Sequence, residues 1–142
     1  MSDIVWSIDS RNDNVDSLIN RIHDSCSSTL PSAEITYSFN IEGLDREKTI
    51  RSEIRKNVYL IAREALNNIL KHSGASNVEI EMINTDDLFI MSLADNGTWE
   101  KSNNKLTGHG IRNMKTRAEE IGGSVEISKN CGTKIKFTMH RI

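Results

Sequence analysis

Length, composition and charge exclude several classes of protein before any motif is considered. The chain has 142 residues, 37% of them hydrophobic, and a formal net charge of −2. This length suits one domain with a real hydrophobic core, and the charge shows no overall basic field of the kind that binds nucleic acid or an anionic membrane.

The first part of the chain predicts short helices followed by one strand. Apolar residues recur at helical spacing as far as Ile22, and the turn-prone "DSRNDN" (9–14) divides this region into two short helices. "SSTLPS" (27–32) ends it with the only proline of the chain. "EITYSFNI" (34–41) then alternates apolar and polar residues, which is typical of a strand with one buried face.

Residues 47–73 predict a long amphipathic helix, because their apolar residues recur at steps of three and four. Gly74 follows as a C-terminal cap. "VEIEMI" and "LFIMSLA" predict two strands joined as a hairpin through "NTDD". A long polar loop (95–110) comes next, then a helix over "IRNMKTRAEEI" and a terminal hairpin (124–142). Strands cluster without the regular alternation of a parallel sheet, so we expect an α+β fold with helices packed on one face of a mixed sheet.

The long helix carries a polar stripe at the edge of its apolar face. At about 100° per residue, Glu64, Asn68 and Lys71 fall within roughly 60° of arc. An asparagine oxygen is a hard, neutral ligand suited to Mg²⁺, which also binds substrate phosphates, and a lysine offers those phosphates a positive charge. The alternative is a solvated helix edge with a ladder of polar contacts, and the stripe by itself favours that alternative.

Two glycine-containing segments offer further candidates. Asp95 opens "DNG" (95–97) at the end of a strand, where its carboxylate could accept a hydrogen bond from an exocyclic amine such as that of adenine. Asp-Asn-Gly is also an ordinary turn sequence. In "TGHGIRNM" (107–114), Gly108 and Gly110 precede a helix, so bare N–H groups and the helix dipole could bind phosphate. Neither segment is specific by itself, and the order and spacing of all three features carry the signal.

In that order, "REALNNILKHS", "DNG", "GHGIRNMKTRAEEIGG" and "GTKIKF" resemble the N, G1, G2 and G3 boxes of the GHKL ATPases. The resemblance is best to the ATP-binding domains of bacterial sensor histidine kinases, in the subfamily that signals to response regulators with helix-turn-helix outputs. It covers roughly residues 31–142. It implies a Bergerat-type α/β sandwich that binds ATP and Mg²⁺.

The resemblance implies roles for the polar residues of the long helix. Asn68 matches the Mg²⁺-binding asparagine of the N box, and Glu64 matches the polar residue one turn earlier, which in kinases orients metal-bound water. Lys71 and His72 match positions near the phosphates and the nucleotide. Asn67 receives no role.

The other boxes imply the remaining contacts with the nucleotide. Asp95 matches the aspartate that reads the adenine amine, and Gly97 gives the base room. Gly108 and Gly110 match the glycines that hold the phosphates at the end of a mobile lid. Thr133 matches the threonine beside the adenine site.

One departure from the family pattern leaves other functions open. Trp99 stands where the G1 box usually has its second glycine, which bears on the lid hinge and on nucleotide affinity. It keeps open the alternative that the chain is a non-catalytic interaction module, in which nucleotide binding orders the lid and the ordered lid binds a partner. An anti-sigma factor serine kinase of the same superfamily is the alternative within the fold. Such proteins tend to begin at the first strand, so the N-terminal segment argues against it.

The phosphoacceptor histidine of a sensor kinase is expected outside this chain. His23-Asp24 superficially resembles an acceptor box, but Pro31 and a strand follow too soon for a hairpin of helices averaging ~11 residues. We interpret residues 1–30 as the end of the dimerisation and phosphoacceptor hairpin and its linker, and 31–142 as the catalytic domain. That domain would bind Mg-ATP and, in the parent kinase, pass the γ-phosphoryl group to the acceptor histidine.

The expected partners and location follow from this interpretation. The partners are ATP, the phosphoacceptor hairpin and a cognate response regulator, with no nucleic acid and no membrane contact, and the chain alone is expected to be a monomer. No apolar run reaches the ~20 residues that span a bilayer, and Cys26 and Cys131 form no metal-binding cluster. We expect a cytoplasmic domain, with membrane attachment of the parent left open.

Overall fold

The computed structural model describes residues 14–97, 109–129 and 132–142. A five-stranded sheet has the order β1-β2-β3-β5-β4. β1 (Thr36–Glu42) runs parallel to β2 (Asn77–Asn84), and the other neighbours, β3 (Leu88–Asp95), β5 (Thr133–His140) and β4 (Ser124–Lys129), pair antiparallel. Both predicted hairpins are therefore present in this mixed sheet.

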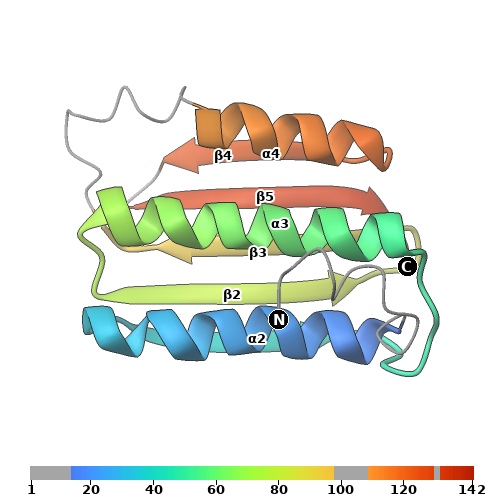
Figure 1. The fold of residues 1–142 in the computed structure, drawn as a ribbon, viewed down its shortest axis with the longest axis horizontal. Coiled ribbons are helices and arrows are strands. Elements are labelled where there is room, and N and C mark those ends of the chain that lie inside the picture. The colour runs from blue at the N-terminus through green and yellow to red at the C-terminus, as the bar shows by residue number, and fades with distance from the viewer. Residues whose placement is uncertain (1–13, 98–108, 130–131) are drawn as a thin grey trace.

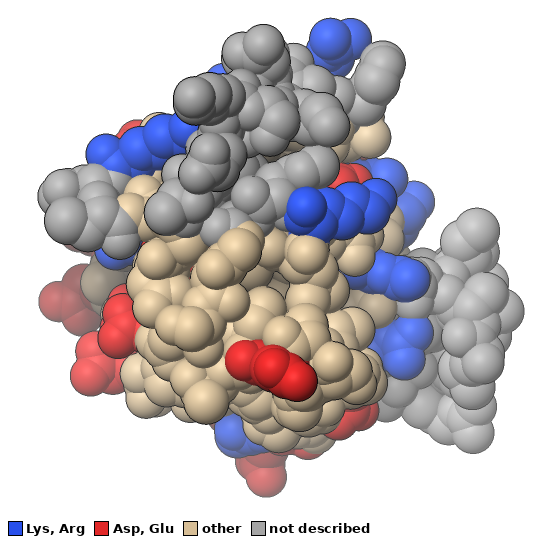
Figure 2. Space-filling model, turned by 90° about the vertical axis from the view of Figure 1, so that its left-hand side faces the viewer, with Lys and Arg blue, Asp and Glu red and all other residues tan. Residues whose placement is uncertain are grey.

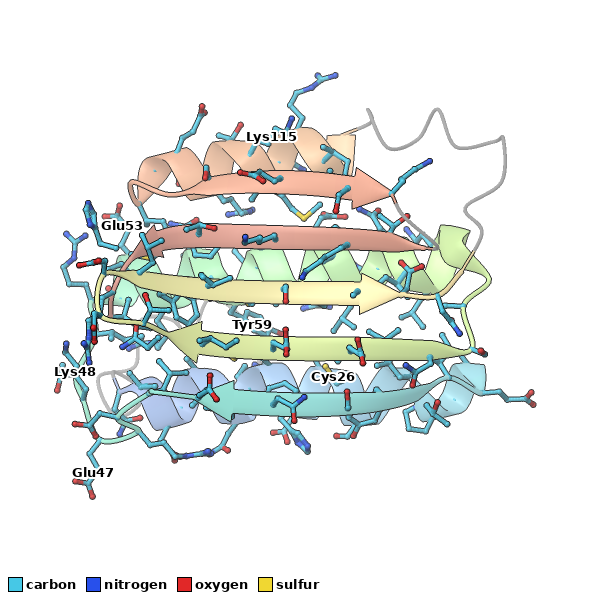
Figure 3. All side chains as sticks on the ribbon, turned by 180° about the vertical axis from the view of Figure 1, so that it is seen from behind. Cys26, Glu47, Lys48, Glu53, Tyr59 and Lys115 are labelled. Atoms are coloured by element: carbon cyan, nitrogen blue, oxygen red, sulfur yellow. The ribbon has the colours of Figure 1, made fainter. Side chains whose placement is uncertain are left out.

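The helices of the described ranges form a layer on one face of the sheet (Figure 1). They are α2 (Val15–Thr29), α3 (Ser52–Asn68) and α4 (His109–Glu120), with a 3₁₀ turn η2 (Pro31–Ala33) and a π-helical turn η3 (Ile69–Ser73). Figure 3 shows the opposite face of the sheet, which none of these helices covers. The predicted α+β fold class is confirmed. None of the helices described is long and apolar enough to cross a bilayer.

Alternation along the strands decides which side chains meet the helices. The inward side chains of β3 and β5 are almost fully buried: Phe89, Met91, Leu93, Ile135, Phe137 and Met139. Lys134, which directly precedes Ile135, is exposed. Burial of each large apolar side chain stabilises the fold by about 1.5–3 kcal/mol. The same alternation places Asp95, the last inward position of β3, and Thr133, the first of β5, on the helix side of the sheet.

Residues 14–30 pack into the same core as the rest of the described domain, and the expected division at residue 31 stays a prediction. The apolar stripe of α2, from Val15 to Cys26, is buried in one core with α3 and the sheet. The helix begins at Val15 because Oδ1 of Asn14 accepts a hydrogen bond from the Ser17 N–H at 2.9 Å. Within the expected hairpin end and linker (1–30), residues 1–13 lie outside the described residues.

The long helix begins later than its sequence pattern predicts. Residues 47–51 precede α3, and this connecting segment is tied to the start of α2. The N–H of Val15 donates to the Lys48 carbonyl at 2.9 Å, and Asp16 accepts from Arg46 Nε at 2.6 Å. Ile50 is buried although it is not part of the helix. Its apolar side chain therefore extended the helical pattern of the sequence past the true start of α3. Gly74 has φ 63° and caps the end, as expected.

Candidate functional site

Four elements end or begin at one end of the molecule. α3 and β3 finish there, and β5 and α4 start there, on the left of Figure 1. Figure 2 looks onto this end and shows Lys and Arg side chains gathered on its right, which is the helical side. Positive charge beside the converging elements suits an anionic ligand.

The first group of functional side chains lies between α3 and α4. A Cβ built on Gly110 would be 2.8 Å from Oε2 of Glu64 and 3.3 Å from Oδ1 of Asn68. A glycine at this position lets both oxygens approach the first turn of α4 closely. Glu64 and Asn68 are half-buried, at the border of the apolar face of α3. A carboxylate oxygen and an amide oxygen therefore meet beside a helix N-terminus.

These two oxygens fit a magnesium ion that is shared with a ligand. Mg²⁺ prefers hard oxygen donors, and it commonly keeps several waters and binds substrate phosphates with only one or two protein groups. Within the described ranges no three His, Cys, Asp or Glu side chains lie close enough to hold a metal together. Glu64 and Asn68 suit an ion that arrives with a phosphate ligand better than one held by protein alone.

The second group lies where β3 ends and β5 begins. Asp95 and Thr133 are paired across the two strands, and their exposed fractions are 7% and 3%. Oδ1 of Asp95 accepts a hydrogen bond from the Gly97 N–H at 2.9 Å. Oγ1 of Thr133 is buried without a hydrogen-bond partner. A buried hydroxyl without a partner costs about 1–3 kcal/mol, and such a cost is often offset at functional sites by a bound ligand.

Gly132 received no role from the sequence, yet the two strands meet at this point only because it is glycine. Its φ is 133°, and a Cβ there would lie 1.9 Å from the backbone oxygen of Asp95. No other residue fits that space or that backbone conformation. The only sequence signal was a glycine before the strand, since the close approach depends on the pairing of β3 with β5.

Several predicted site residues lie apart from these two groups. Lys71 is exposed in η3, where the π-helical turn breaks the straight-helix projection that placed it on the stripe of Glu64 and Asn68. The backbone of His72 lies in the same turn, but its side chain is outside the described structure, as are Gly108 and Trp99.

His23 is an exposed residue of α2 whose ring lies beside β1. Its ring meets Phe39 edge-on, with centroids 5.1 Å apart. Tyr37 makes a similar contact with the ring at 6.3 Å. These contacts are on an exposed side chain, and the interpretation that His23 is not the phosphoacceptor stays a prediction.

Two hollows lie on the helical face. One, of about 440 Å³, lies between α2 and α3 around Arg21, Tyr59 and Arg63, and it contains none of the predicted nucleotide residues. The other, of about 290 Å³, lies between α3 and α4 and includes Glu64. The larger hollow is therefore separate from the candidate site, which is defined by the two groups of polar side chains.

Comparison with known proteins finds sequence similarity to sensor proteins. The sensor protein VraS of Staphylococcus aureus (strain COL) is 35% identical over 86 residues, covering 58% of this chain and 25% of VraS. VraS of Staphylococcus haemolyticus is 34% identical over the same length. The chain thus spans about a quarter of the length of these relatives. No protein-family model matches it.

The fold is shared with solved histidine kinase domains. The catalytic domain of histidine kinase ThkA superposes with a TM-score of 0.72 at 14% identity, covering 90% of this chain and 94% of ThkA's. The histidine kinase domain of the blue-light activated kinase EL346 from Erythrobacter litoralis gives 0.69 at 14% identity, covering 86% and 64%. The chain is thus similar in sequence to the VraS sensor proteins over 86 residues, and it shares the fold of histidine kinase catalytic domains.

Proposed function

We propose that the chain binds Mg-ATP at the end of the molecule where α3, β3, β5 and α4 converge. In the parent kinase it then passes the γ-phosphoryl group to a histidine outside the chain. One observation carries this proposal: the Glu64, Asn68 and Gly110 group and the Asp95 and Thr133 pair lie at the same end of the fold. A nucleotide has an aromatic base at one end and phosphates at the other, and each group suits one of them.

Asp95 and Thr133 would bind the adenine. An ionised carboxylate can only accept hydrogen bonds, so Asp95 suits the exocyclic amine of the base. The Gly97 N–H already orients one of its oxygens. The Thr133 hydroxyl can donate to a ring nitrogen or accept from the amine. Satisfying this buried hydroxyl would remove the cost that it carries in the nucleotide-free fold.

Glu64, Asn68 and Gly110 would bind the phosphate end. The oxygens of Glu64 and Asn68 would hold Mg²⁺, and the first N–H groups of α4 would donate to the phosphates. Bound Mg²⁺ supplies neutralisation of phosphate charge. The protein contributes mainly the positions of these groups, because phosphoryl transfer depends on alignment and charge stabilisation. The acceptor hairpin and a response regulator would come from the remainder of the signalling system.

Calorimetric titration of the chain with ATP, with and without Mg²⁺, tests the proposal. Asn68 and its neighbour Asn67 provide a matched pair, since both are asparagines on α3 and only Asn68 faces Gly110. We expect Asn68→Ala to weaken binding in Mg²⁺ by about tenfold or more, a loss of about 1.4 kcal/mol, and Asn67→Ala to change it little.

The base-binding half is tested in the same titration. Asp95→Asn keeps the size of the side chain but replaces one acceptor oxygen by a donor, so we expect ATP affinity to fall at least tenfold, with or without Mg²⁺. A folded wild-type chain that shows no heat of ATP binding would contradict the proposal. Equal losses for Asn67→Ala and Asn68→Ala would remove the magnesium assignment.

A further inference from the structure

Asn96 connects the end of β3, which carries Asp95, with the segment that follows α3 and η3. Its Oδ1 accepts hydrogen bonds from the N–H groups of Ser76 and Asn77 at 2.9 and 3.0 Å. Its Nδ2 donates to Oγ of Ser76 at 2.9 Å, and its own N–H donates to the Asn77 carbonyl at 3.2 Å. Asn96 directly follows Asp95, whereas Ser76 and Asn77 lie shortly after Asn68 in the chain.

These contacts leave the segment after α3 little freedom. Thr36, at the start of β1, donates to the Ser76 carbonyl through its N–H at 3.0 Å and through Oγ1 at 3.2 Å. All four backbone groups of Ser76 and Asn77 are therefore paired, although this part of the surface is exposed. Three of those four groups bond to Asn96. The segment cannot move relative to the end of β3 without breaking several hydrogen bonds together.

The fixed segment follows, along the chain, the helix that carries Asn68. Only η3, Gly74 and Ala75 separate Asn68 from Ser76, and Gly74 holds the left-handed conformation that ends the helix. On the other side, Asp95 and Gly97 flank Asn96 and bond to each other. Asn96 thus stands between the carboxylate assigned to adenine and the chain segment that leaves the magnesium-binding helix.

We propose that Asn96 is a positioning residue, which sets the spacing between Asp95 and the C-terminal end of α3 before the nucleotide arrives. This inference rests on the proposed function. ATP has to reach both halves of the site at once, so its affinity depends on how well their spacing is fixed in advance. Asn96 need not touch the nucleotide to have this effect.

Asn96→Ala, compared with Thr85→Ala, tests the inference by ATP titration in Mg²⁺. Thr85 is the matched control because it ties the other end of β2 and β3 with a similar set of bonds. Its Oγ1 accepts from the N–H groups of Asp87 and Leu88 at 3.3 and 3.0 Å. Both variants should lose comparable stability. We expect Asn96→Ala to weaken ATP binding by about tenfold, and Thr85→Ala to leave it within about twofold.

Asn96→Asp supplies a rescue. A carboxylate keeps the acceptor for the Ser76 and Asn77 N–H groups, and the Ser76 hydroxyl can rotate to donate to it. We expect this variant to recover ATP affinity to within about threefold of the wild type. Wild-type affinity in Asn96→Ala, or equal losses in Asn96→Ala and Thr85→Ala, would overturn the positioning role while leaving the proposed function intact. Absent binding by the wild type would instead overturn the proposed function, and this inference with it.

Discussion

Thr133 combines a stability cost with an expected role in binding. Its hydroxyl is buried without a hydrogen-bond partner in the nucleotide-free fold. Thr133→Val replaces that hydroxyl by a methyl group of similar size, so we expect the free energy of unfolding to stay level or rise by about 1 kcal/mol. The same change should weaken ATP binding severalfold, because the base loses a polar contact. Urea unfolding and calorimetry on one preparation measure both effects.

Thr138→Val is the control for this prediction. Thr138 lies on the same strand but faces the uncovered side of the sheet and is half-exposed. We expect it to change neither stability nor ATP affinity appreciably. A Thr133→Val variant that is clearly less stable than the wild type would show that the hydroxyl already has a partner in the free protein.

Cys26 makes the stability of the folded chain depend on pH. Burial raises the pKa of its thiol from 9.0 to about 12, because the interior disfavours the thiolate. Between these values the unfolded chain releases the thiol proton and the folded chain keeps it. Stability from this group is therefore complete below about pH 9 and declines above it, by at most about 1.4 kcal/mol per pH unit.

Urea unfolding of the wild type and of Cys26→Ala at several pH values between about 8 and 10.5 checks this decline. The alanine variant is less stable throughout because it leaves a cavity, but its stability should fall less steeply above pH 9. Parallel curves for the two proteins would contradict the prediction.

At the scale of the elements, the packing of α2 leads to a prediction about stability. Leu18 is fully buried in the core that α2 shares with α3 and the sheet. Leu18→Ala should therefore lower the free energy of unfolding by about 2–5 kcal/mol. The exposed Ser27→Ala on the same helix should change it by less than about 0.5 kcal/mol. Both should unfold in one cooperative transition. A separate early transition in Leu18→Ala would place α2 outside the cooperative unit.

The elements were predictable wherever local pattern decides the structure. Alternation located the strands, and Gly74 marked the end of α3, because these signals depend on neighbours in sequence. The start of α3 was not predictable in this way. Residues 47–51 hold the start of α2 instead of forming a helical turn, and that contact joins segments about thirty residues apart. Only the folded arrangement reveals it.

At the scale of the molecule, the candidate site also combines residues that local motifs predicted with residues that only the folded structure reveals. Glu64, Asn68 and Gly110 were predicted from their motifs, and the structure brings them together. Asp95 and Thr133 were likewise predicted separately and are paired by the sheet. Gly132 and Asn96 were missed because their importance lies in contacts across strands, which leave no periodic signal in the sequence.

The whole chain should bind ATP without phosphorylating itself. Among the histidines whose side chains are described, His23 packs against Phe39 on β1. His140 pairs with Leu88, seven residues along β3 from Asp95, or about 24 Å at the rise of a strand. Incubation with ATP labelled at the γ-phosphate should therefore leave no acid-labile label on the chain. Label should appear on the parent's phosphoacceptor hairpin when that is supplied. Label on the chain alone that disappears in His23→Gln would instead make His23 the acceptor and contradict the prediction.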